Sequence, residues 1–130
     1  MEITLYDGKG HPIAYIADDG EYSIYLWKGH AVAYIDGENI YGWNGKHLGW
    51  FVNGILYNLR GQRVGSIGEK CLYTLYASPI KYAKYAKYAK YAKYAKYARY
   101  AAYARPVFSS SYSSQEMLVD FLKKGAVGTI

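Results

Sequence analysis

The sequence predicts a mainly β fold: four similar β-hairpins, followed by a long basic and aromatic helix and a short amphipathic C-terminal helix. Three observations support this prediction. The first 70 residues repeat a hairpin pattern four times, residues 81–104 repeat a Lys-Tyr-Ala-like triplet eight times, and a capped amphipathic stretch follows near the C-terminus. We therefore divide the chain into a four-hairpin β-domain over 1–77, an arm over 78–105, and a Ser-rich link with a short helix over 106–130.

The four hairpin units align over residues 5–16, 24–35, 40–51 and 56–67. A glycine, an early tyrosine and a closing apolar residue fall in register in every unit, and the glycines are offset by 19, 16 and 16 residues. Such self-similarity indicates one supersecondary unit used four times. The glycines are Gly10, Gly29, Gly45 and Gly61, the tyrosines are Tyr6, Tyr25, Tyr41 and Tyr57, and the closing residues are Ile16, Ile35, Phe51 and Ile67.

Turn signals separate the short apolar runs. Asn44-Gly45 lies inside a unit, and Asp36-Gly37 and Asn53-Gly54 lie between units. Gly, Asn and Asp tolerate the positive φ that tight hairpin turns need, and such frequent turns leave no room for helices. An isolated hairpin is only marginally stable in water, so the four hairpins must share a core. Small residues recur where the strands would crowd near a common axis: Ala14, Ala33, Gly49 and Gly65.

Two repeated halves, Tyr25-Leu26-Trp27-Lys28-Gly29 and Val32-Ala33-Tyr34-Ile35, carry a family resemblance. Over about residues 1–70 the chain resembles the four-fold beta-flower family of small bacterial domains. The resemblance implies four hairpin petals around a pseudo-four-fold axis, and it implies no particular activity. Repeats one and four depart from the pattern, because Gly8 and Leu59 replace the tryptophans and Ser66 replaces a closing-strand aromatic residue.

The tryptophans Trp27, Trp43 and Trp50 are candidates for an aromatic cage that holds a sugar or choline-type ligand. A local likeness to choline- or wall-binding repeats, through Gly42-Trp43-Asn44-Gly45, supports this reading. Such aromatic residues more often form the core of hairpins, particularly in a domain with few leucines. Ligand binding by these residues is therefore the lesser alternative.

The triplet tract concentrates both positive charge and aromatic surface. Residues 81–105 carry eight basic residues and no acidic one, so the tract supplies a charge of +8 to a chain whose net charge is +6. The remainder of the chain is slightly acidic. The candidate binding or assembly residues are Lys81, Tyr82, Lys84, Tyr85, Lys87, Tyr88, Lys90, Tyr91, Lys93, Tyr94, Lys96, Tyr97, Arg99, Tyr100, Tyr103 and Arg105.

Intrinsic preference favours a helix over 81–104, because Ala and Lys are good helix formers and Tyr costs little. Ser78-Pro79 suits its start and Pro106 its end. Three residues turn a helix by about 300°, so the tyrosines wind around the rod and leave no fixed apolar face. Lysines three residues apart repel across a turn, and an extended or partner-ordered form is the alternative.

We expect this arm, together with the short C-terminal helix, to mediate self-association into a homo-oligomer or filament, because the tyrosines carry more apolar area than a solvated rod can leave exposed. Acidic residues of the β-half can pair with the tract within the chain or between copies: Asp18, Asp19, Glu21, Asp36 and Glu38. The main alternative is a nucleic acid or another polyanion, since cations suit phosphates and tyrosines stack on bases. A further alternative is that the tract is only a solvated, charged spacer.

A second short helix is predicted after the Ser-rich link. Ser113 and Glu116 form a capping-box pattern, and Gly125 suits the C-terminal end of a helix. One face of this helix is apolar, and it docks either on the chain's own core or on a neighbouring copy. The residues of this face are Met117, Leu118, Phe121 and Leu122.

Enzyme, metal and cofactor chemistry find little support in the sequence. His11 and His30 occupy equivalent repeat positions, which repeat symmetry explains better than a metal site does. Cys71 stands alone, so we expect no disulfide and no cofactor. No signal peptide or membrane-spanning stretch is visible, which favours a cytoplasmic location, with export by a non-classical route as the alternative.

Overall fold

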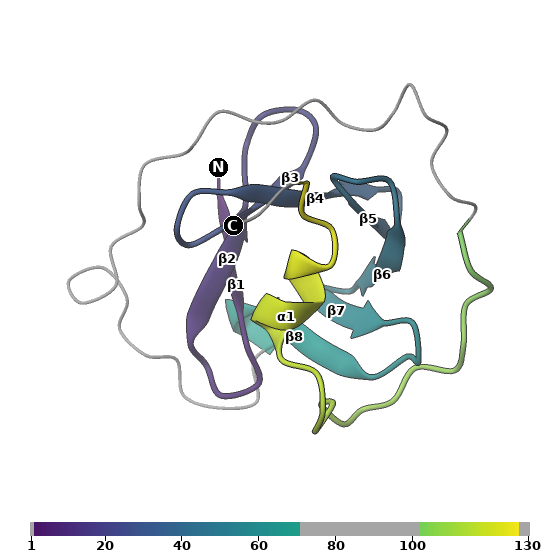
Figure 1. Cartoon of the computed structure of the whole chain (residues 1–130). Coiled ribbons are helices and arrows are strands. Elements are labelled where there is room, and N and C mark those ends of the chain that lie inside the picture. The colour runs from purple at the N-terminus through teal and green to yellow at the C-terminus, as the bar shows by residue number, and fades with distance from the viewer. Residues whose placement is uncertain (1, 71–101, 128–130) are drawn as a thin grey trace.

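The computed structural model describes residues 2–70 and 102–127, and within them eight antiparallel strands close into a barrel. Each strand pairs with the next, and β1 pairs with β8, so the chain passes once around the axis (Figure 1). The predicted series of four hairpins is confirmed. The strands are β1 (Ile3–Tyr6), β2 (Pro12–Ile16), β3 (Ser23–Leu26), β4 (Ala31–Asp36), β5 (Asn39–Gly42), β6 (His47–Val52), β7 (Ile55–Asn58) and β8 (Arg63–Ile67), followed by the short 3-10 helix η1 (Gly68–Lys70).

The turn predictions are confirmed by the backbone. Gly10, Gly29, Gly45 and Gly61 adopt φ values of 86°, 100°, 89° and 78°. These values lie in the left-handed region, which glycine reaches without the steric cost that a Cβ imposes. The repeated glycines are thus required by the turn at the tip of each hairpin.

All four hairpins contain a bulge at the same place, which the sequence analysis did not predict. The register shifts at Tyr6, Tyr25, Tyr41 and Tyr57, where one residue of the partner strand is skipped and each tyrosine pairs with the residue beyond it. A bulge bends its strand and increases the local twist. The extra residues belong to the central core or pack against it, and they are Ile13, Val32, Leu48 and Val64. The bulges therefore help to close a short-stranded sheet around one apolar centre.

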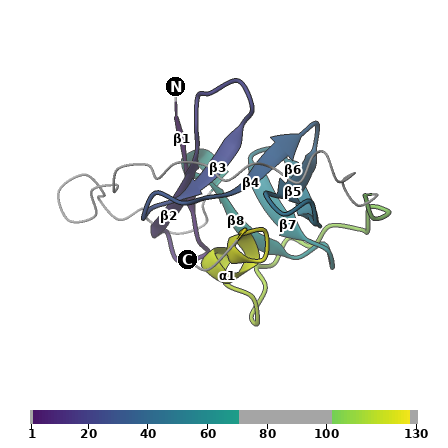
Figure 2. The same cartoon turned by 45° about the horizontal axis from the view of Figure 1, so that its top comes forward.

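The C-terminal helix α1 (Leu118–Lys123) lies at the centre of the ring of strands in Figure 1 and at one end of the barrel in Figure 2. Leu118, Phe121 and Leu122 are fully buried in the central core. Of the two predicted alternatives, docking on the chain's own core is what the structure has. Each buried side chain of this size contributes about 1.5–3 kcal/mol through the hydrophobic effect. Met117 of the predicted face remains 45% exposed.

The small residues of the repeats make room for this helix. A Cβ built on Gly49 would lie 3.1 Å from Cζ of Phe121, and one on Gly65 would lie 2.8 Å from Cδ2 of Leu118. Both would also meet backbone oxygens of neighbouring strands at 2.8 Å or less. Small residues near a common axis were predicted from the repeats, and Gly49 and Gly65 leave the end of the barrel open for α1.

The capping prediction is right about the contact and wrong about the helix start. The Glu116 N–H donates to Oγ of Ser113 at 3.1 Å, as a capping pattern requires, yet the first helical residue is Leu118. The Glu116 carboxylate does not return to the Ser113 backbone, because the Asn58 amide and the Lys124 ammonium bind it instead. Gly125 follows the helix as predicted. A Cβ there would lie 2.4 Å from the Val32 carbonyl oxygen, so close packing explains this glycine.

Aromatic clusters fill the spaces between neighbouring hairpins, which we call wedges. In the first wedge, the rings of Tyr15 and Tyr25 stack with their centroids 5.5 Å apart, and Trp27 lies edge-on to Tyr15. The second wedge repeats this arrangement. Its residues are Tyr34, Tyr41 and Trp43.

The other two wedges each lack some of the repeat aromatics, at Leu59 in one and at Gly8 and Ser66 in the other, and the C-terminal link supplies replacements. Phe108 stacks on Tyr57 in the wedge where Leu59 replaces tryptophan. The centroids of the two rings are 3.9 Å apart, and the angle between their planes is 5°. The Tyr112 ring lies against Gly8, where an added Cβ would be 2.9 Å from it, and its hydroxyl lies 3.5 Å from that of Ser66. The departures of repeats one and four thus mark the places where the link docks.

The predicted long helix falls almost entirely on residues outside those described. Its final part, residues 102–105, is described and has no regular secondary structure, so a helix that reaches Ala104 is wrong. The Tyr103 N–H donates to Nδ1 of His47 and Arg105 pairs with Glu38, so contacts with the barrel replace helical hydrogen bonds.

Candidate functional site

The two ends of the barrel carry opposite charge. In a closed antiparallel barrel of eight strands, the tips of all hairpins lie at one end, and the connections between hairpins lie at the other. We call these the helix end and the acidic end. Seven of the ten acidic residues lie at the acidic end: Glu2, Asp18, Asp19, Glu21, Asp36, Glu38 and Glu69.

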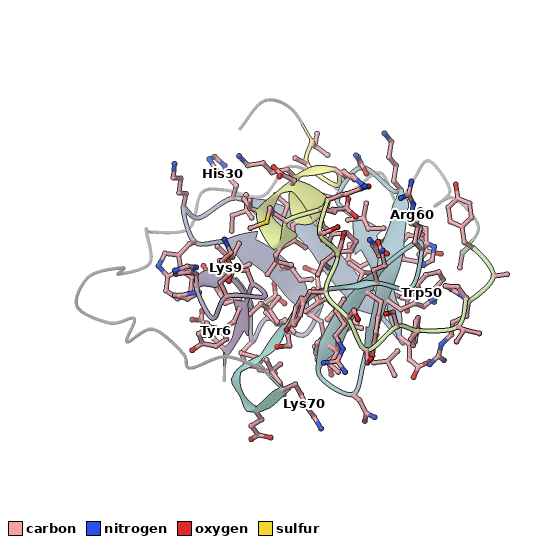
Figure 3. The ribbon with its side chains drawn as sticks, turned by 90° about the horizontal axis from the view of Figure 1, so that it is seen from below. Tyr6, Lys9, His30, Trp50, Arg60 and Lys70 are labelled. Carbon is pink, nitrogen blue, oxygen red and sulfur yellow. The ribbon has the colours of Figure 1, made fainter. Side chains whose placement is uncertain are left out.

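The helix end is basic. Each hairpin tip presents one cation next to its turn glycine, and α1 adds two more beside them. Figure 3 shows His30 and Arg60 on the side of α1, with Lys70 at the opposite end of the molecule. The cations of the helix end are Lys9, Lys28, Lys46, Arg60, Lys123 and Lys124.

A hollow of about 830 Å³ lies at the acidic end. Its walls combine apolar side chains with two exposed carboxylates, Glu21 and Asp36. Ile3 is 43% exposed and Tyr22 is 61% exposed, so apolar and aromatic surface faces solvent here. The other apolar and aromatic wall residues are Ile16, Tyr34, Ile35 and Phe51. This surface suits a ligand that is both cationic and aromatic.

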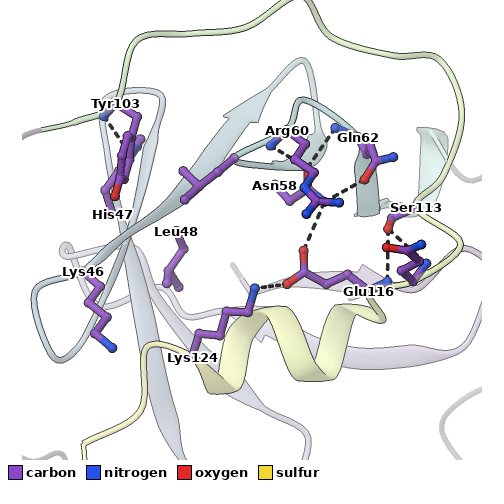
Figure 4. Close-up of a pocket in the computed structure, with 12 residues that line it drawn as sticks. Lys46, His47, Leu48, Asn58, Arg60, Gln62, Tyr103, Ser113, Glu116 and Lys124 are labelled. Carbon is purple, nitrogen blue, oxygen red and sulfur yellow. Dashed lines mark hydrogen bonds and ion pairs between the residues drawn. The ribbon is translucent and has the colours of Figure 1, made fainter.

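A second hollow, of about 600 Å³, lies beside α1 (Figure 4). Polar groups inside it bind one another: Asn58 donates to Oε1 of Glu116 at 3.1 Å, and Lys124 pairs with the other carboxylate oxygen. The Asn58 oxygen accepts the N–H groups of Arg60 and Gln62 at 3.0 Å. This network joins the tip of the fourth hairpin to the approach to α1, which favours a structural role.

His47 links this hollow to the end of the triplet tract. Its Nδ1 accepts the Tyr103 N–H at 3.1 Å, so Nε2 carries the proton and donates to Oδ1 of Asn39 at 3.1 Å. The His47 and Tyr103 rings stack with their centroids 5.8 Å apart. Burial lowers the pKa of the imidazole from 6.5, against a smaller opposite effect of the Gly49 backbone. The neutral form is therefore the one that holds Tyr103.

The described residues on either side of the tract lie on the barrel. Before it, η1 ends at Lys70 at the acidic end. After it, Arg105 pairs with Glu38 at 2.7 Å and lies over the Phe108 ring at 4.8 Å. Beyond that point, residues 109–113 form backbone hydrogen bonds with Gly61 and Arg63. The end of the predicted arm is therefore held on the barrel.

Of the predicted tract residues, only Tyr103 and Arg105 belong to the described part of the chain, and both contact the barrel. The other fourteen lie outside it. The three tryptophans lie in separate wedges or clusters, packed against different aromatic neighbours. Trp43 and Trp50 are buried, and this placement favours the packing role over a shared cage.

Within residues 2–70 and 102–127, no group of three His, Cys, Asp or Glu side chains has the geometry of a metal site. His11 lies 3.4 Å from the Asp7 carboxylate in the first hairpin tip. In the same ranges no helix is long and apolar enough to span a membrane.

A family model described as 4-fold beta flower protein matches residues 3–122. This chain belongs to the 4-fold beta flower family. The match extends well beyond the resemblance over residues 1–70 and ends within α1. A beta flower domain here thus includes the helix that closes the barrel. Searches of curated proteins and of solved structures gave no significant match.

Proposed function

We propose that this beta flower protein is a non-catalytic structural protein that self-associates through its Lys-Tyr-Ala tract. The contacts that fix the end of the tract on the barrel, through Tyr103 and Arg105, carry the proposal. A segment held in this way is presented by a folded platform, and it carries eight tyrosines and eight cations over residues 81–105.

The aromatic surface supplies the driving force. Tyrosine rings bury large areas on contact, and rings repeated at every third residue allow contacts with more than one neighbour. A contact between different surfaces of two copies that does not close into a ring produces an open chain. The C-terminal helix takes no part in this proposal, because its apolar side chains are buried in the chain's own barrel.

The test is sedimentation velocity at increasing protein concentration and at two salt concentrations. We expect the native chain to form higher oligomers, and the variant Tyr85→Ser, Tyr88→Ser, Tyr91→Ser, Tyr94→Ser to remain largely monomeric. A native chain that stays monodisperse and monomeric at every concentration and salt would rule out self-association.

Binding of a nucleic acid or another polyanion is the second candidate function, and the charge of the tract together with the basic helix end favours it. We would expect salt-sensitive retention of DNA or RNA, lost in Lys84→Gln, Lys87→Gln, Lys90→Gln, Lys93→Gln. The matched control is Lys9→Gln, Lys28→Gln, Lys46→Gln, Lys123→Gln, which removes the same charge from the helix end. Equal loss in both variants would assign binding to net charge and not to the tract.

A further inference from the structure

We propose that the hollow at the acidic end of the barrel binds the Lys-Tyr-Ala tract of a second copy of the chain. This inference rests on the proposed function and names the surface that receives the tract. The walls of the hollow combine apolar side chains with two carboxylates, Glu21 from the connection before β3 and Asp36 from the end of β4.

The hollow and a triplet are complementary in two respects. The carboxylates of Glu21 and Asp36 can pair with lysine ammonium groups, and a tyrosine ring can pack against Ile3 and the exposed Tyr22 ring. The same chemistry is already present nearby: Arg105, the last cation of the basic stretch, pairs with Glu38 at 2.7 Å at this end. The helix end is basic, so it would repel the tract, and charge therefore distinguishes the two ends.

The size of the hollow favours a second copy. Ten residues line it, whereas the tract has eight near-identical triplets over 24 residues. One hollow can therefore hold only a few triplets, and the others remain to engage the acidic ends of neighbouring copies. Repeated weak contacts of this kind gain strength through multivalency, because each bound triplet raises the effective concentration of the next. Lys70 at the same end opposes binding to a small extent.

The test uses the full-length chain in two measurements. A synthetic peptide of four Lys-Tyr-Ala triplets is titrated while amide NMR signals of Gly20 and Gly37, which line the hollow, are followed. Self-association is measured by sedimentation on the same samples. The variants are Asp36→Asn and the double variant Glu21→Gln, Asp36→Asn, and the matched control is Asp120→Asn, which removes an exposed carboxylate from α1 at the other end.

We expect the peptide to shift the Gly20 and Gly37 signals. An exposed ion pair contributes about 0.2–1 kcal/mol, so Asp36→Asn should weaken peptide binding and self-association about 1.5- to 5-fold, and the double variant should weaken both further. Asp120→Asn should change neither. Ile3→Ser, which keeps the charges, should also weaken both. The amide spectra of all variants report whether the barrel remains folded.

The outcomes separate this inference from the proposed function. Self-association that is unchanged in the acidic-end variants, with no peptide shifts at the hollow, would overturn the inference and leave assembly through the tract standing. A monomeric native chain would overturn both. If that monomer still bound the peptide at the hollow, the tract would occupy its own barrel, and the assignment to a second copy would be wrong.

Discussion

At the scale of single residues, His47 couples the protonation of the barrel to the tract. Its neutral ring accepts the Tyr103 N–H and donates to Asn39, and burial lowers its pKa below 6.5. A proton on Nδ1 would remove the acceptor and would place a positive charge in a buried site. We therefore expect the end of the tract to be released from the barrel more readily in acid.

The sign of the pH dependence follows from linkage. The unfolded chain binds a proton at His47 below about pH 6.5, whereas the folded chain stays neutral to lower pH, so stability falls as pH decreases through this window. We expect thermal unfolding of His47→Gln to lose this component of the pH dependence. The control His30→Gln should retain it. Equal pH profiles for the native chain and His47→Gln would contradict the assignment.

Glycines at the barrel wall show where local sequence reasoning succeeds and where it ends. The tip glycines were predictable, because turn chemistry is local. Gly49 was predictable only as a small residue, since the atoms that exclude a Cβ there belong to Tyr57 and Phe121. These contacts depend on register and on α1, which no single repeat encodes.

At the scale of elements, α1 belongs to the core of the barrel. We expect Leu118→Ala to lower the free energy of unfolding by about 2–5 kcal/mol, because it leaves a cavity in a fully buried site. The neighbouring Met117→Ala is the matched control and should cost less than about 1 kcal/mol, since Met117 is 45% exposed. Chemical denaturation measures both. Similar losses for the two variants would mean that the helix is not seated as described.

The C-terminal link is likewise part of the folded unit. Phe108→Ala removes a stacked partner of Tyr57, and we expect a loss of about 1–3 kcal/mol of unfolding free energy. Val107→Ala, at a side chain that is 93% exposed, should be close to neutral. The same denaturation measurement applies. An unchanged free energy of unfolding in Phe108→Ala would show that the wedge around Tyr57 does not depend on the link.

The sequence contained a signal for this docking that was not used. Gly8, Leu59 and Ser66 break the aromatic pattern of repeats one and four, and an incomplete wedge needs an aromatic residue from elsewhere. Phe108 and Tyr112 were the available ones in the link. The four bulges, by contrast, could not be predicted, because a bulge is a property of the pairing between two strands.

At the scale of the whole molecule, the charge pattern follows from topology. The acidic β-half and the basic tract were predicted from the sequence. The separation of cations at the hairpin tips from most of the acids, which lie at or beyond the opposite ends of the strands, was not predicted. Closure of the barrel separates these two kinds of turn, so a pattern that alternates along the chain becomes an axis with opposite ends.

This polarity bears directly on the assembly that we propose. Lys70, before the tract, and Arg105, at its end, both lie at the acidic end, so one copy carries both a basic, aromatic segment and a surface of opposite charge. Such heterologous pairing can continue from copy to copy. Both tyrosine contacts and ion pairs contribute, so high salt should weaken assembly without abolishing it.

Sedimentation velocity of the full-length chain across a concentration series tests the central proposal most directly. We predict oligomers that grow with concentration and are lost when Tyr85, Tyr88, Tyr91 and Tyr94 are replaced by serine. The lysine control at the helix end, Lys9→Gln, Lys28→Gln, Lys46→Gln, Lys123→Gln, should leave them in place. A native chain that sediments as a single monomeric species at every concentration would contradict the account.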